Sequence, residues 1–175
     1  MDDIYLAVTA EHEAAHAAVY LSQDVEISLV DAGDDPITVV AHPRPRPVLD
    51  DAVVAMAGPL VEARYREFDF AREVAELSEF LEEEGLAWGD SGWAWGEQNT
   101  DLAIFTKHPN LLSIARELAK IKLELFADLH REITEALLEA PDHRLTGKDL
   151  DLLPLAGPMQ RRAREVRAAK DASNS

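Results

Sequence analysis

Two histidines and a glutamate stand close together near the start of the chain, in the run His12-Glu13-Ala14-Ala15-His16. In a helix, residues four apart lie on one face a turn apart, so both imidazoles can offer a nitrogen to one Zn²⁺. Glu13 would lie beside the ion, where its carboxylate can take the proton of an attacking water. The H-E-x-x-H spacing therefore indicates metal-assisted hydrolysis with Glu13 as general base.

Two histidines leave such a site incomplete, because catalytic zinc sites have three protein ligands and one open position. The chain has no cysteine, so the third ligand must be another histidine or a carboxylate. The candidates are Glu62, Asp101, His42, His108 and His130. The macrodipole of an expected helix favours a carboxylate at Asp101, whereas histidines at such positions are more typical of surfaces and caps. Residue types alone leave this choice open.

The motif must lie on a helix for this geometry to hold. Residues 2–22 are rich in alanine, contain no glycine or proline, and place apolar residues at helical spacing, which predicts a helix. Two short β-branched runs follow, 25–31 and 37–42, and predict a hairpin-like pair of strands.

Further helices are expected downstream. One should run over 50–65, capped by Asp50 or Asp51, with a kink or break at Gly58-Pro59. Another covers 70–84.

The second half begins with a loop rich in glycine and tryptophan, 85–98, which we expect to cover or border the metal face. A helix should start at Asn99 or Thr100 and stop at His108-Pro109, and a long one should follow over 110–140. Its single apolar stripe would comprise Leu111, Ile114, Leu118, Ile121, Leu125, Leu129, Ile133 and Leu137.

A last short helix should run from a Thr146 cap through Leu153. The 175 residues suit one domain, assigned to 1–159, followed by a tail over 160–175 with five basic and two acidic residues. The formal net charge of −17 argues against nucleic acid as a partner. No stretch has the roughly 18 consecutive apolar residues of a membrane span, and the acidic start is unlike a signal peptide. We therefore expect a cytoplasmic protein without membrane insertion.

The motif and three later segments together resemble the FtsH-type zinc metalloproteases, the peptidase domain of membrane-anchored AAA proteases. HEAAHAAV resembles that family's H-E-A-G-H-A motif, and two expected strands follow it in the same order. MAGPLVEARY is similar to its G-G-x-x-A-E helix, NTDLAIF to its S-N-D-L helix start, and LTGKDLDLL to its C-terminal L-x-G-x-x-[IL]-x-x-L segment. The resemblance spans residues 4–153.

The resemblance implies a site and a fold. It makes Asp101 the third zinc ligand beside His12 and His16, and it places Glu62 near the metal as a supporting residue. The implied fold is α+β and mostly helical, a zincin-like domain with a small β-sheet packed on the motif helix. The chain departs from the family at Ala15, where the family has glycine, and at Pro59, where a helix former is usual.

The expected function is an ATP-independent zinc metalloendopeptidase acting on peptides or unfolded proteins, since the chain contains no P-loop. The hexameric assembly of the full-length proteases does not transfer to this chain, and a homo-oligomer stays open as an assembly state. One alternative is a zincin-like regulatory or binding module that keeps the metal site without peptidase activity. Another is a helical interaction protein without a metal.

Overall fold

The computed structural model describes residues 3–34, 36–83 and 100–173 of the chain. Most of these residues are helical, and the described strands form one small antiparallel sheet. This agrees with the expected α+β class. The expected loop over 85–98, with its three tryptophans, lies outside the described residues.

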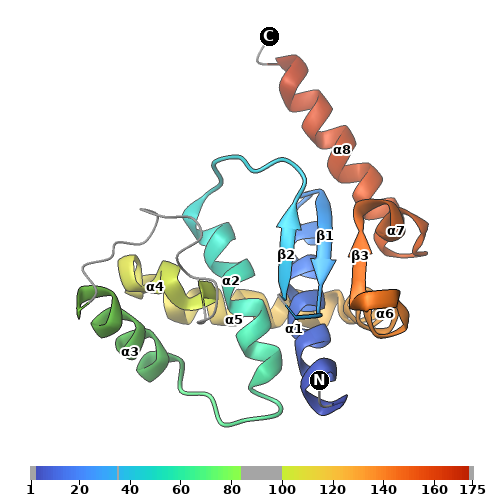
Figure 1. Ribbon diagram of the computed structural model, residues 1–175. Helices are drawn as coiled ribbons and strands as arrows, with labels where there is room; N and C mark the ends of the chain where they lie inside the picture. Colours follow the sequence, from blue (N-terminus) through green and yellow to red (C-terminus); the bar gives the residue numbers. More distant parts are fainter. Residues whose placement is uncertain (1–2, 35, 84–99, 174–175) are drawn as a thin grey trace.

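Helix α1 (Asp3–Ser22) carries the histidine motif and lies at the centre of the molecule (Figure 1). It is packed on two sides. Ala15 and Val19 belong to a core cluster with helix α2 (Val48–Glu62). Ala14 and Ala18 belong to a second cluster with the sheet and helix α6 (Ala127–Glu139). The alanines are fully buried, and their small side chains let neighbouring elements approach the motif closely from both sides.

The sheet has the strand order β2-β1-β3, in which β1 is Ile27–Asp31, β2 is Ile37–Val40 and β3 is Arg144–Thr146. Both pairings are antiparallel, and Val30 of β1 lies opposite Thr38 of β2. The first two strands agree with the expected hairpin, although each is shorter. Strand β3 was not predicted, because three residues are too short to show an alternating pattern. Within the described sheet, β2 is an edge strand beside α1.

Helix α2 (Val48–Glu62) differs from the prediction in two respects. Its N-cap is Pro47 rather than an aspartate, and Asp50 and Asp51 instead occupy the first turn, where the helix dipole favours carboxylates. The expected break at Gly58-Pro59 is also absent from this helix, which continues through Pro59 to Glu62. Residues on both sides of the proline are buried, so packing offsets the backbone hydrogen bond that Pro59 cannot donate.

The long helix predicted over 110–140 is wrong. A 3₁₀ turn over 109–111 leads into α5 (Leu112–Leu125), and α6 (Ala127–Glu139) follows after Phe126, whose backbone is not helical (φ −112°, ψ 27°).

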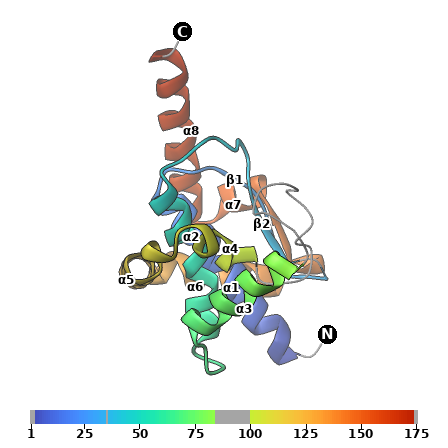
Figure 2. The same cartoon turned by 90° about the vertical axis from the view of Figure 1, so that its left-hand side faces the viewer.

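The single apolar stripe expected there is also wrong for α5. Ala115, Ala119 and Leu123 form its buried face, since the alanines allow close packing against α2, whereas Ile121 and Leu125 are exposed. Helix α5 lies at one margin of the molecule (Figure 2).

Four α-helices remain in the described part of the chain. They are α3 (Phe70–Glu83), α4 (Ala103–Lys107) after a 3₁₀ turn over 100–102, α7 (Gly147–Leu152) and α8 (Ala156–Ser173). Thr146 caps α7 through the backbone N–H of Asp149, as predicted. The expected domain boundary between residues 159 and 160 falls inside α8, which projects from the body towards the C-terminus (Figure 1).

None of the described helices combines the length and the apolar character needed to cross a membrane.

Candidate metal centre

Helix α1 presents the imidazoles of His12 and His16 on one face, one turn apart. Their Nε2 atoms are 2.9 Å apart, and the two rings meet edge to face. His16 is buried. Residue spacing in the α-helix is sufficient to create this pair.

Asp101 reaches the pair from the 3₁₀ turn that precedes α4. Its Oδ2 atom lies 2.8 Å from Nε2 of His12 and 3.2 Å from Nε2 of His16. Ligand atoms around a tetrahedral ion with bonds of about 2.1 Å lie about 3.4 Å apart. The three atoms are therefore already close to the spacing that one small metal ion requires.

Among the described residues, His12, His16 and Asp101 form the group whose ligand atoms converge in this way. The other candidates for the third ligand have different surroundings. His130 contacts the backbone oxygen of Glu11, and His108 ends α4. His42 lies on the surface, 3.9 Å from Glu26.

The far side of each imidazole is held by an oxygen. Nδ1 of His12 donates to Oε1 of Glu62 at 2.6 Å, and Nδ1 of His16 donates to the backbone oxygen of Val54 at 2.8 Å. Both acceptors come from α2. Such bonds fix the tautomer of a ligating histidine, and they direct the Nε2 lone pair towards the metal.

The donor set fits a divalent cation. Two Nε2 atoms that face each other at 2.9 Å need a proton or a cation between them, because their lone pairs repel. Imidazole nitrogens with one carboxylate oxygen are ligands that suit zinc, with a fourth position left open. Glu13 and Glu62 add negative charge around this cluster, which a cation would offset.

The electrostatics of the cluster point the same way. Burial lowers the pKa of His12, but hydrogen bonds with Asp101 and Glu62 outweigh it and raise the value to about 10. Burial raises the pKa of Asp101, but His16 and His12 hold it well below its usual range. The site therefore favours positive charge between the histidines and a deprotonated Asp101.

Glu13 lies beside this cluster and is buried, with 6% of its surface exposed. The hydroxyl of Thr38 lies 2.8 Å from its Oε2 atom. Burial raises the pKa of Glu13, although the nearby His16 and His12 oppose the shift. A buried carboxylate with a raised pKa is a stronger base than an exposed one, which suits a general base.

Sequence reasoning missed two contacts of the site. The backbone oxygen of Val54 carries no side-chain signature, so no pattern could have revealed it. Thr38 is a β-branched residue inside a strand, and such residues are so common in strands that a threonine there gives no sign of a functional role. Only the position of β2 beside α1 in the fold reveals the contact of Thr38 with Glu13.

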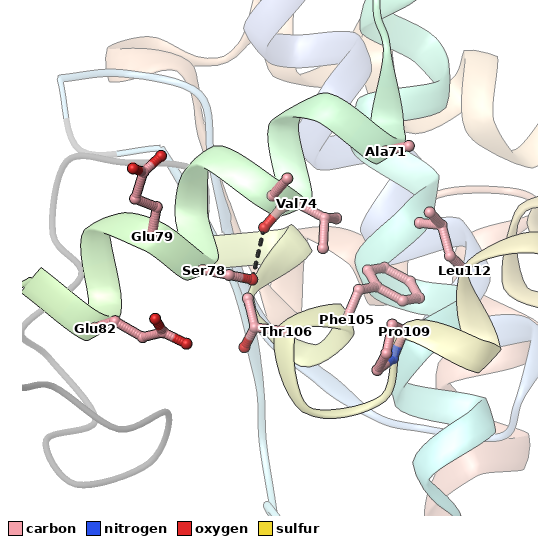
Figure 3. Close-up of a pocket in the computed structure, with 10 residues that line it drawn as sticks. Ala71, Val74, Ser78, Glu79, Glu82, Phe105, Thr106, Pro109 and Leu112 are labelled. Carbon is pink, nitrogen blue, oxygen red and sulfur yellow. Dashed lines mark hydrogen bonds between the residues drawn. The ribbon is translucent and has the colours of Figure 1, made fainter.

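A hollow of about 550 Å³ lies between α3 and α4 (Figure 3). Val74, Phe105 and Leu112 supply apolar walls, and Glu79 and Glu82 lie along one side. None of the three candidate ligands lines it. The hollow is therefore distinct from the metal centre.

Searches against protein-family models, curated proteins and solved structures found no match to this chain.

Proposed function

We propose that this protein is a zinc-dependent metalloendopeptidase with a zincin-like fold of the FtsH type. One observation carries the proposal. Three ligand atoms, from His12, His16 and Asp101, converge at distances of 2.8–3.2 Å. Glu13 follows His12 in α1, is buried, and interacts electrostatically with all three residues. A site that only held a structural metal would not need a buried carboxylate beside it.

A zinc ion bound there would supply Lewis acidity, which polarises a carbonyl and makes water more acidic. The protein's own residues do the rest. Glu13 accepts the proton of the attacking water and can pass it to the departing amine. Glu62 and the Val54 carbonyl keep both imidazoles oriented throughout.

A peptide substrate is supported by the sheet. Among the described residues β2 pairs with β1 alone, so no other strand from that part of the chain would compete with an extended substrate for its second backbone edge. An added strand would form backbone hydrogen bonds with little dependence on sequence. Thr38 of β2 contacts Glu13, so a substrate strand paired with β2 would run close to the general base.

The test is hydrolysis of casein, an unfolded protein, by the zinc-loaded full chain without ATP. Glu13→Gln should retain zinc and the fold, since the amide is nearly isosteric with the carboxylate. It should lose roughly 10²–10⁴-fold in kcat, because proton transfer to a positioned side chain contributes about that much. Bound zinc and circular dichroism are measured on the same samples.

Equal cleavage by the wild type and Glu13→Gln would overturn the proposal, because the activity would then not depend on this site. Absence of cleavage by a zinc-loaded wild type across several unfolded substrates would favour a regulatory or binding module that retains the metal.

A further inference from the structure

Thr38 connects the edge strand β2 to the carboxylate beside the candidate metal centre. Its Oγ1 atom lies 2.8 Å from Oε2 of Glu13 and 3.0 Å from the backbone oxygen of the same residue. Both atoms that it reaches are acceptors, so the hydroxyl is the donor in either bond. Thr38 and Glu13 are 25 residues apart in sequence, and they meet because β2 packs on α1.

We propose that Thr38 is a positioning residue that orients the Glu13 carboxylate for catalysis. This inference rests on the proposed peptidase function. A hydrogen bond to Oε2 restrains the rotation of the carboxyl group and leaves the second oxygen to receive the proton of the attacking water. A carboxylate without that bond can turn about its last side-chain torsion, which has a broad energy profile.

The choice of residue supports an orienting role. Threonine is branched at Cβ, so its side chain has few rotamers in a strand, and its hydroxyl is held more firmly than that of serine. Catalytic groups must be kept within about 0.5 Å of their productive geometry by neighbours of this kind. Thr38 also ties the general base to the strand on which a substrate would pair, so it fixes the base relative to the peptide.

A purely structural role makes a different prediction. The contact with the Glu13 carbonyl fastens β2 to α1, so removing the hydroxyl should lower the melting temperature under either interpretation. Only an orienting role also predicts a loss of kcat at unchanged KM and unchanged zinc content. Substrate pairing with β2 and the metal ligands do not involve the hydroxyl.

The variants follow from this distinction. Thr38→Val removes the hydroxyl and keeps the shape, and Thr38→Ser restores the hydroxyl with less restraint. Ser28→Ala is the matched control, since the Ser28 hydroxyl donates to the backbone oxygen of Val39 at 3.1 Å in the same sheet but does not touch Glu13. Thr38→Ala serves in place of Thr38→Val if the valine variant does not fold.

The experiment measures kcat and KM on labelled casein, bound zinc and the melting temperature for each zinc-loaded variant. We expect Thr38→Val to lose about 10- to 100-fold in kcat, as is typical for partners that orient catalytic groups, with zinc and KM retained. Thr38→Ser should recover most of that loss, and Ser28→Ala should match the wild type. A kcat for Thr38→Val within twofold of the wild type, or no recovery in Thr38→Ser, would overturn the proposal.

A second measurement, the position of the Glu13 carboxylate in crystal structures, tests the orienting role without relying on peptidase activity. Crystal structures of the zinc-loaded wild type and Thr38→Val show the carboxylate directly. We expect one Glu13 oxygen on Thr38 in the wild type and a turned or multiply placed carboxylate in the variant. An identical carboxylate in both would refute the orienting role even if the protein cleaved nothing. Failure of the peptidase function instead appears as equal activity of the wild type and Glu13→Gln.

Discussion

Gly58 of α2 lies so close to His12 of α1 that no side chain fits between them. A Cβ atom built on Gly58 would come within 2.2 Å of Nε2 of His12, the nitrogen that faces the candidate metal centre. Real Cβ atoms do not approach other atoms to that distance, so even alanine would force the imidazole or the helix to move. The glycine is thus a requirement of the site, imposed by the packing of α1 against α2.

Gly58→Ala should therefore disrupt metal binding more than its small size suggests. We expect at least a 10-fold loss in zinc affinity, because the added methyl displaces a nitrogen of the candidate metal centre, and a destabilisation of about 1–3 kcal/mol from overpacking. Zinc affinity is measured by competition with a chromophoric chelator, and stability by urea unfolding.

Gly157→Ala is the control for this experiment. Its Cβ would lie 2.4 Å from the backbone oxygen of Asp151, so it should also destabilise the protein, but it lies in α8 and contacts no candidate ligand. Equal zinc affinity of Gly58→Ala and the wild type would show that His12 is not held as described.

Asp101 and Glu62 both contact His12, but from opposite sides of the ring, and this predicts different effects on metal binding. Asp101→Asn should remove most zinc, because an amide oxygen is a weaker ligand than a carboxylate. Glu62→Gln keeps an oxygen that can accept from Nδ1 of His12 but removes its charge, so it should cost no more than about 10- to 100-fold in affinity, the usual effect of changing an outer hydrogen-bond partner. Zinc is counted per chain by atomic spectroscopy after dialysis, and a larger loss in Glu62→Gln would reverse the assignment of ligand and supporting residue.

Zinc should also stabilise the folded chain, because the proposed site forms only when α1 and the turn around Asp101 come together. At a free zinc concentration of 100 times Kd, mass action adds about 2.7 kcal/mol. The melting temperature should rise with zinc and fall again with a chelator, and it should hardly respond in His16→Ala. An unchanged melting temperature in the wild type at saturating zinc would argue against a native metal site.

The sequence predicted some parts of this structure better than others, for physical reasons. The helix around His12 and His16 was predicted because alanine favours helices and the spacing is local. The approach of Asp101 depends on tertiary packing, and sequence spacing alone left it open among five candidates; only the family resemblance selected it. The continuous helix over 110–140 was wrong because apolar periodicity continues across Phe126 although the backbone does not.

The same limit applies to small residues. Ala115, Ala119 and Gly58 carry no strong periodic signal, yet they decide where α2 lies against its neighbours. Sequence patterns identify large apolar residues as core, whereas close helix packing depends on the absence of side-chain volume. For this reason the sequence suggested the ligands but not the surfaces that bring them together.

His130 makes the free energy of unfolding depend on pH, and it does so apart from the candidate metal centre. Its Nε2 donates to the backbone oxygen of Glu11 at 2.9 Å. Burial lowers the pKa of His130, and Arg64 adds to that effect, while the hydrogen bond and the charge of Glu11 oppose it. The neutral imidazole is therefore the form that the fold prefers.

The sign of the effect follows from linkage. In the unfolded chain the pKa of His130 is near its ordinary value of about 6.5, which is above its pKa in the folded chain. At a pH between these two pKa values, the unfolded state therefore binds more protons than the folded state. This contribution to stability is fully present above pH 6.5 and is lost as the pH falls through the lower folded pKa.

His130→Gln can still donate to the Glu11 carbonyl but does not titrate. Urea unfolding of both proteins with a chelator present, from pH 8 to pH 5, should show the wild type losing more free energy of unfolding on acidification than the variant. Parallel curves would mean that His130 is not buried in its neutral form.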